Sequence, residues 1–189
     1  MLPDYVIAHG DDRPAILVTP AHAFVFPLTD QDLNDLDMLQ TKYAEEENCS
    51  GLAAPQIGIS KCAIIFEVPD DEILRRFRKD LTQSMPKTLW LNPHYEGIES
   101  KGTNDDWEGC FSVADLVGLV TRYNEITYEA YDKEGVLHAG MAQGFLARVI
   151  QHEIDHLNGQ LFIDLIPTDR RMTREAYMEM RKKAMEGEA

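Results

Sequence analysis

The sequence has no long hydrophobic run and few positive charges. No stretch approaches the roughly 18 apolar residues that identify a membrane-spanning helix, so we expect no contact with a membrane. Against 33 Asp and Glu the chain has 18 Lys and Arg, which gives a formal net charge of −15. Broad nucleic-acid binding requires basic surface, so this composition argues against it. Residues 1–5 lack the basic start of a signal peptide, which predicts a cytoplasmic location.

Cysteine is scarce and its count is odd. Cys49, Cys62 and Cys110 do not form the even framework of a secreted disulfide protein. Each is expected to be either a buried thiol or a reactive or metal-binding one. No internal repeat, low-complexity tract or linker divides the chain, so we expect residues 1–189 to form one domain and the protein to be a monomer.

Hydrophobic periodicity and turn residues predict both helices and strands. Helices are expected at residues 30–47, 141–157 and 169–185, and residues 70–81 are expected to form either a short surface helix or a surface excursion. Strands are expected at residues 61–68, 88–91, 95–100, 125–131 and 136–138. Residues 1–28 are expected to be irregular, and residues 103–106 to form a turn. The fold class is therefore predicted to be α+β, with mostly antiparallel sheets packed around the helix at 141–157 and with a C-terminal helix.

The segment His152-Glu153-Ile154-Asp155-His156 is the most informative pattern. Histidines four residues apart lie on one face of a helix, so both imidazoles can bind one metal ion. A bound divalent ion lowers the pKa of its water to about 7, and Glu153 can then accept the proton. The apolar residues that precede the motif predict a buried helix, where unpartnered polar groups would be costly. The pattern therefore indicates a metal-dependent amide hydrolase.

A catalytic metal site usually has three protein ligands and one open position. The extended protease motif would need a histidine where this chain has Phe162. Glu175 and Glu179 follow at plausible distances for a thermolysin-like ligand, but their surroundings do not match that class. The remaining histidines have no suggestive context: His9, His22, His94 and His138. Cys110 follows a glycine and offers a thiolate, a strong ligand for borderline-soft metals, so it is the favoured third ligand.

Three segments, in order, resemble the signature motifs of the peptide deformylase family. They are residues 51–56 (GLAAPQ), 108–112 (EGCFS) and 151–157 (QHEIDHL). The resemblance extends from about Gly51 to Asp164. It implies that the chain removes the N-terminal formyl group from formyl-methionyl peptides of newly made proteins and releases formate.

The resemblance also implies roles for individual residues. Cys110, His152 and His156 would be the metal ligands. Water activated at the metal would attack the formyl carbon, with Glu153 as general base and then general acid, while Gln56 would polarise the formyl oxygen. The family's metal is usually Fe²⁺, with Zn²⁺, Ni²⁺ or Co²⁺ able to replace it, whereas ligand chemistry alone would favour Zn²⁺.

Two further groups are expected to contact the substrate. The backbone N–H of Phe111 would donate to the oxyanion, and Gly51 would let the substrate backbone pair along its strand. Cys49 and Ser50 stand where the family usually has glycine and an aliphatic residue, which leaves the substrate side chain open. The alternative is therefore a deacylase of the same fold that acts on another N-acylated amine. A third possibility is a non-catalytic metal-binding or interaction protein. Glu153 argues against it, because a structural metal site would not need this additional carboxylate.

Two expectations concern residues around the site. Asp155 or a main-chain carbonyl is expected to orient a ligand imidazole. Glu108 and Arg122 either form an ion pair that supports the Cys110 loop or remain separate surface residues. Residues 168–189 contain six Arg and Lys against five Asp and Glu, so the C-terminal helix either docks on ribosomal RNA or is a solvated helix with mixed charge pairs.

Overall fold

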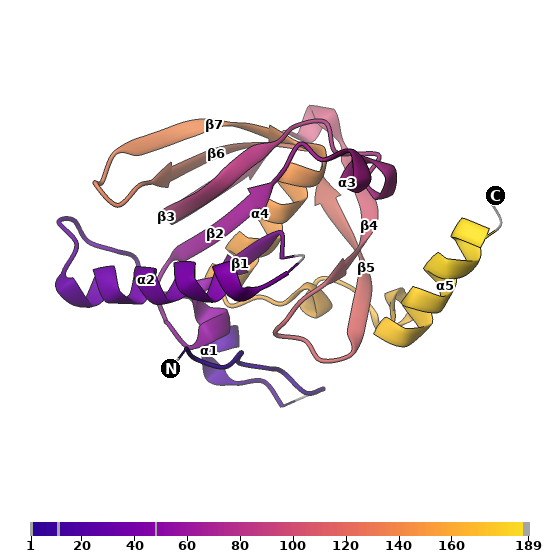
Figure 1. Cartoon of the computed structure of the whole chain (residues 1–189), viewed down its shortest axis with the longest axis horizontal. Coiled ribbons are helices and arrows are strands. Elements are labelled where there is room, and N and C mark those ends of the chain that lie inside the picture. Colours follow the sequence, from indigo (N-terminus) through magenta and orange to yellow (C-terminus); the bar gives the residue numbers. More distant parts are fainter. Residues whose placement is uncertain (1, 11, 48, 187–189) are drawn as a thin grey trace.

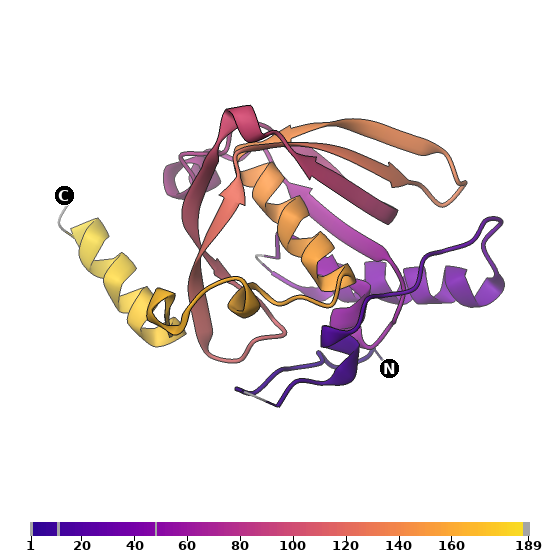
Figure 2. The same cartoon turned by 180° about the vertical axis from the view of Figure 1, so that it is seen from behind.

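The segment with the histidine motif forms the central helix of the molecule, α4 (Gly144–Leu157). In the computed structural model, which describes residues 2–10, 12–47 and 49–186, α4 lies between two antiparallel sheets (Figure 1; Figure 2 gives the view from behind). The α+β fold class with antiparallel sheets and a C-terminal helix is confirmed. No helix of these described residues is long and apolar enough to cross a bilayer.

The larger sheet has the strand order β1-β2-β3-β6-β7. Its strands are β1 (Gly51–Ala53), β2 (Ala63–Val68), β3 (Met85–Gly97), β6 (Glu125–Tyr131) and β7 (Leu137–Gln143). The smaller sheet has the order β4-β5-β8. Its strands are β4 (Thr103–Gly109), β5 (Leu116–Tyr123) and β8 (Arg171–Thr173).

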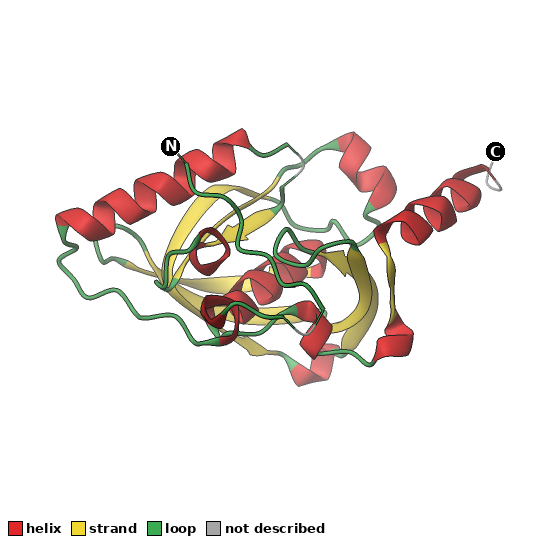
Figure 3. Cartoon of the chain, turned by 90° about the horizontal axis from the view of Figure 1, so that it is seen from below, coloured by secondary structure: helices red, strands yellow, loops and turns green. Residues whose placement is uncertain are grey.

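The remaining α-helices surround the two sheets (Figure 3). They are α1 (Ala15–Val18), α2 (Asp30–Glu45), α3 (Glu72–Phe77) and α5 (Arg174–Glu186). Short 3₁₀ turns link other elements: η1 (Ala54–Ile57), η2 (Glu99–Lys101), η3 (Phe162–Asp164) and η4 (Thr168–Arg170). The α2 helix starts at the expected place because Thr29 and Asp32 form a reciprocal capping box.

Helix α4 begins three residues later than the sequence predicted. Residues 141–143 belong to β7, which pairs with β6 up to Gln143. Gly144 then turns the chain with φ +58°, and a Cβ at this position would lie 2.1 Å from the carbonyl oxygen of Asp80. Only glycine tolerates both conditions. At the other end α4 stops at the predicted residue 157, where Asn158 caps it and Gly159 follows with φ +71°.

The hydrophobic core forms mainly where α4 packs on the larger sheet. The α4 side chains Leu146, Ile150 and Ile154 are buried in one cluster with residues of that sheet, such as Phe66 and Ile126. A second cluster lies between α2 and the same sheet, and a third surrounds Cys110 beside the smaller sheet. Full burial of one such aliphatic side chain stabilises the fold by about 1.5–3 kcal/mol, so α4 is firmly fixed.

The predicted turn at residues 103–106 is wrong, because these residues begin β4. That strand pairs with β5 from Thr103↔Tyr123 to Gly109↔Val117. Acidic residues are unfavourable in strands, but here they have distant partners: Asp105 accepts hydrogen bonds from Thr121 and Arg170, and Asp106 pairs with Arg78. Sequence patterns near residue 105 cannot reveal these partners.

Three other predictions needed correction. Residues 1–28, which were expected to be irregular, contain the short helix α1 at Ala15–Val18. The strand that was expected to break at Asn92-Pro93 continues through it as β3, with a register shift between Leu91 and His94. Asn92 has φ +48° and exchanges two hydrogen bonds with the backbone of Phe24. The C-terminal helix begins at Arg174 rather than Asp169, because residues 171–173 first pair with β5 as β8.

Candidate active site

Three of the predicted site residues meet at one point, although they come from different elements. Cys110 follows β4, while His152 and His156 lie one turn apart on α4. One potential ligand atom of each residue lies within 4.8 Å of those of the other two. The Cys110 Sγ and His156 Nε2 atoms are 3.2 Å apart. This arrangement of one sulfur and two imidazole nitrogens matches the donor set of a catalytic metal centre.

Hydrogen-bond donors surround the sulfur of Cys110. Gln56 Nε2 and the backbone N–H of Ser112 both donate to Sγ, each over 3.3 Å. The Gln56 amide is oriented by its other end, where Oε1 accepts from the Ala53 N–H over 2.8 Å. Both donors therefore point at the sulfur atom that lies beside the two imidazoles.

Glu153 is buried beside the three clustered side chains, with 4% of its surface exposed. Its Oε2 atom has no hydrogen-bond partner among the described residues. Burial raises the pKa of Glu153 to about 7, which suits a group that must exchange protons near neutral pH. A Cβ on residue 51 would lie 2.5 Å from Glu153 Oε1, so Gly51 lets β1 approach this carboxyl closely.

A network of buried charges lies behind the cluster, with Glu108 at its centre. Glu108 accepts hydrogen bonds from Arg122 Nε and Nη2, both over 2.9 Å, from Arg148 Nη1 over 2.7 Å and from His152 Nδ1 over 2.9 Å. Burial alone would raise the pKa of Glu108, but the bonds from His152 and Arg122 outweigh it and hold the pKa well below its usual range. The ion pair between Glu108 and Arg122 is therefore present and buried.

This network corrects the expectation for Asp155. Its carboxylate accepts from Arg122 Nη1 over 2.5 Å, whereas the group that holds the His152 ring is Glu108. With Nδ1 bonded to Glu108, Nε2 is the ring nitrogen of His152 that remains as a potential ligand atom. Within the part of the chain that the structure describes, His156 Nδ1 has no partner.

Arg148 is the part of the network that the sequence did not predict. It donates to Glu108, to the carbonyl of Val120 over 3.1 Å and to the carbonyl and side chain of Asn104, both over 3.0 Å. A signal was nevertheless present. Arg148, His152 and Asp155 are spaced i, i+4 and i+7, which places them on one face of an otherwise apolar helix.

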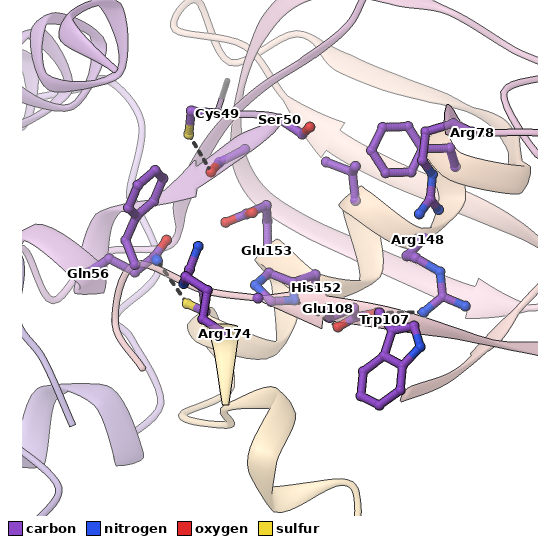
Figure 4. Close-up of a pocket in the computed structure, with 16 residues that line it drawn as sticks. Cys49, Ser50, Gln56, Arg78, Trp107, Glu108, Arg148, His152, Glu153 and Arg174 are labelled. Carbon is purple, nitrogen blue, oxygen red and sulfur yellow. Dashed lines mark hydrogen bonds and ion pairs between the residues drawn. The ribbon is translucent and has the colours of Figure 1, made fainter. Parts of the chain in front are cut away.

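A cavity of about 260 Å³ opens beside the clustered side chains (Figure 4). Cys49, Ser50 and Gly51 line one side, and the Cys110 loop lines another. Phe145 and Val149 of α4 contribute apolar surface. Lining residues that the sequence did not predict include Arg78, Trp107, Arg148 and Arg174. The predicted residues Gln56, Phe111 and Glu153 all lie on this cavity, so the structure brings them together.

A buried carboxyl next to a cysteine sulfur and two imidazoles, at the wall of an open cavity, is an arrangement of metal-dependent amide hydrolases. Comparisons with known proteins identify the family within this class to which the chain belongs. A sequence model described as polypeptide deformylase matches residues 6–172. A peptide deformylase 2 from Rickettsia conorii is 56% identical, over 99% of this chain and 94% of the relative. The chain belongs to the peptide deformylase family.

Solved structures agree with this result. A Met-Ala-Ser-bound class I type b peptide deformylase from Acinetobacter baumannii superposes with a TM-score of 0.72 at 29% identity, covering 88% of this chain and 99% of that chain. A peptide deformylase from Ehrlichia chaffeensis has a TM-score of 0.72 at 25% identity, covering 100% and 99%. The family is metal-dependent, and the chain is an enzyme that removes the formyl group from formyl-methionyl peptides, which is favoured over the alternative of another acyl group.

Proposed function

We propose that Cys110, His152 and His156 hold the catalytic metal ion and that Glu153 moves the proton during formyl removal. The observation that carries this proposal is the meeting of the three ligand atoms within 4.8 Å of one another, beside a buried carboxyl with an unpartnered oxygen. A structural metal site would be closed by a fourth ligand and would not need a spare carboxyl.

The donor set fits a divalent transition metal. The hydrogen bonds from Gln56 and Ser112 hold Cys110 Sγ in place, and the bond to Glu108 fixes the ring of His152. We propose Fe²⁺ as the metal in the cell, with Zn²⁺, Ni²⁺ or Co²⁺ as replacements in purified protein. A thiolate beside Fe²⁺ is prone to oxidation, so an anaerobic preparation should retain more activity than an aerobic one.

When bound, the ion would polarise the formyl carbonyl and lower the pKa of water in the site. Glu153 takes the proton from the attacking water and delivers it to the amine that leaves. The Gln56 side-chain amide and the backbone N–H of Phe111 donate to the oxyanion, and each such donor typically contributes about 3 kcal/mol of transition-state stabilisation. Gly51 lets the substrate backbone lie along the free edge of β1, where strand pairing orients the formyl group.

The decisive experiment is an anaerobic formate-release assay on formyl-Met-Ala-Ser, with metal content measured on the same sample. Glu153→Gln should retain the metal and lose at least about 100-fold in kcat, because the proton acceptor is gone. Cys110→Ser should lose metal as well as activity. Cys62→Ser is the matched control, since Cys62 lies outside the cavity and its Sγ contacts the carbonyl of Ala21. Full formate release by a metal-loaded Glu153→Gln enzyme would refute the proposed role.

We also propose that residues 1–189 act as one domain and as a monomer in the cytoplasm, where ribosomes produce the substrate. Helix α5 extends away from both sheets (Figure 1) and carries Arg181, Lys182 and Lys183 near its end. We propose that it docks on ribosomal RNA. Sedimentation with ribosomes should fall in Arg181→Glu/Lys183→Glu, and unchanged sedimentation would exclude this docking.

A further inference from the structure

Arg174 is a cation at the active-site cavity that comes from the C-terminal segment. It is the first residue of α5 and lines the cavity together with Gln56 and Glu153. Its Nη2 atom lies 3.5 Å from the position that a Cβ on Gly109 would occupy, so the guanidinium lies against the loop that carries Cys110. In Figure 4 the Arg174 side chain extends from the C-terminal segment toward the other residues that line the cavity.

The backbone around Arg174 is fixed by three contacts. Residues 171–173 pair with β5 immediately before it. The Arg174 N–H donates to the carbonyl of Asp115 over 2.8 Å. One turn into α5, the ring of Tyr177 packs on that of Trp107, with 5.6 Å between their centroids. The cation is therefore presented to the cavity by an ordered segment.

Arg174 differs from the other two arginines of the cavity in its partners. Arg78 pairs with Asp80 and Asp106, and Arg148 pairs with Glu108. For Arg174, the residues that the structure describes provide no ion-pair partner and no side-chain hydrogen bond. The positions of Arg78 and Arg148 are thus explained by the fold, whereas the guanidinium of Arg174 has its donors available to a bound molecule.

We propose that Arg174 is a specificity-determining residue that binds a carboxylate of the peptide substrate beyond the formyl-methionine. This inference rests on the site roles proposed above. The planar guanidinium can form two parallel hydrogen bonds with a carboxylate. The carboxylate can be an acidic side chain at the second or third residue or the C-terminus of a short peptide. Because the chain has a formal charge of −15, its field otherwise repels acidic peptides, and Arg174 offsets this repulsion at the cavity.

The test compares four peptides under low salt. Formyl-Met-Ala-Ser-amide is neutral, formyl-Met-Ala-Ser adds a terminal carboxylate, and formyl-Met-Asp-Ser-amide and formyl-Met-Ala-Asp-amide each add an acidic side chain. The metal-loaded enzyme should prefer at least one carboxylate peptide over the neutral one by about threefold to tenfold in kcat/KM, through KM. The peptide that shows the preference identifies the source of the carboxylate, and added salt should reduce the preference.

Arg174→Ala should abolish or invert this preference, and Arg174→Lys should keep part of it. Arg76→Ala is the matched control, because Arg76 lies on α3 and does not line the cavity, and it should keep the full preference. Calorimetric binding of the product Met-Ala-Ser and its amide to the same holoenzymes tests Arg174 independently of turnover. The ratio of the two affinities should fall in Arg174→Ala.

Two results would overturn the inference. One is an unchanged peptide preference in Arg174→Ala, and the other is a wild-type enzyme without any preference. If the first result came with weaker inhibition by formate in Arg174→Ala, the guanidinium would be assigned to the released formate. Failure of the wild-type enzyme to hydrolyse the neutral peptide would instead count against the proposed catalytic roles, and the product-binding measurement would still decide the role of Arg174.

Discussion

The two faces of α4 are held in the molecule by different forces. Toward the larger sheet, α4 presents aliphatic side chains such as Ile150, which are fully buried in an apolar cluster. Toward the smaller sheet, it presents Arg148, His152 and Asp155, which join a buried network around Glu108. Apolar packing is non-directional and tolerates small shifts, whereas charged hydrogen bonds fix distance and angle.

This difference indicates a division of labour within one helix. The apolar face supplies stability, since burial of aliphatic surface is the dominant favourable term in folding. The polar face is expensive to bury and often adds little net stability over an apolar replacement. Its value here is the orientation of His152 by Glu108, which a hydrophobic contact cannot provide. Three substitutions, on α4 or in its network, test this division, and a fourth, far from α4, serves for comparison. They follow in order of decreasing expected effect.

The most disruptive change should be Glu108→Ala on the polar face. It leaves two buried arginines without their main carboxylate partner, which typically costs about 3–5 kcal/mol of folding free energy. It also frees the ring of His152, so the folded fraction should lose at least about tenfold in metal affinity. Urea unfolding and metal titration measure the two effects. A variant with normal stability would show that the network does not depend on Glu108.

On the apolar face, Ile150→Ala should reduce stability without changing catalysis. The cavity that it creates should cost about 2–5 kcal/mol, because Ile150 is fully buried. The kcat of the folded, metal-loaded enzyme should remain within about twofold of the wild-type value, since Ile150 does not line the cavity. A large loss of kcat at low temperature, where the variant is folded, would contradict the division of labour.

Arg148→Met should have an intermediate effect. Met keeps much of the volume of the side chain, while Glu108 retains its two bonds from Arg122. The lost charged hydrogen bonds should cost about 2 kcal/mol, and kcat should fall less than tenfold because His152 keeps its partner. If Arg148→Met proved as damaging as Glu108→Ala, then Arg148 rather than Glu108 would be the centre of the network.

The smallest effect should come from Asp32, a charge far from α4. Hydrogen bonds from Lys61 and Thr29 lower the pKa of Asp32 to about 2. Because this folded-state pKa lies below the unfolded value, Asp32 stabilises the fold above about pH 4. This contribution is lost as the pH falls toward 2. Asp32→Asn should cost about 1 kcal/mol at pH 7 and less at pH 2, as measured by urea unfolding at both pH values, with formate release unchanged at pH 7.

The sequence predicted those features whose partners lie within a few residues. The start of α2 at Asp30 depends on neighbours in the chain, and so does the spacing of His152 and His156 on one helix. Strand β4 was missed because its acidic residues are held by Arg170 and Arg78, far away in the sequence. Gly51 was expected to lie on a strand, but local patterns did not give the bounds of β1, because it has only three residues.

The site shows the same dependence on sequence distance. Its ligands and Glu153 were predicted because a motif carries them, and their metal-binding roles stay predictions. The bond from His152 to Glu108 spans 44 residues and the bond from Arg148 to Glu108 spans 40, so neither can be read from local spacing. Arg174 was assigned only to a charged helix, because its approach to the cavity depends on the pairing of β8 with β5.

The contact between Gly51 and Glu153 has a consequence for the design of an inactive enzyme. Any side chain at residue 51 would overlap the carboxyl, since even a Cβ would lie 2.5 Å from Oε1. A single methyl group there would push the carboxyl aside without removing any chemical group from the site. Gly51→Ala thus offers a way to obtain a protein that binds metal and has an intact carboxyl but turns over slowly, which is useful for trapping uncleaved peptide.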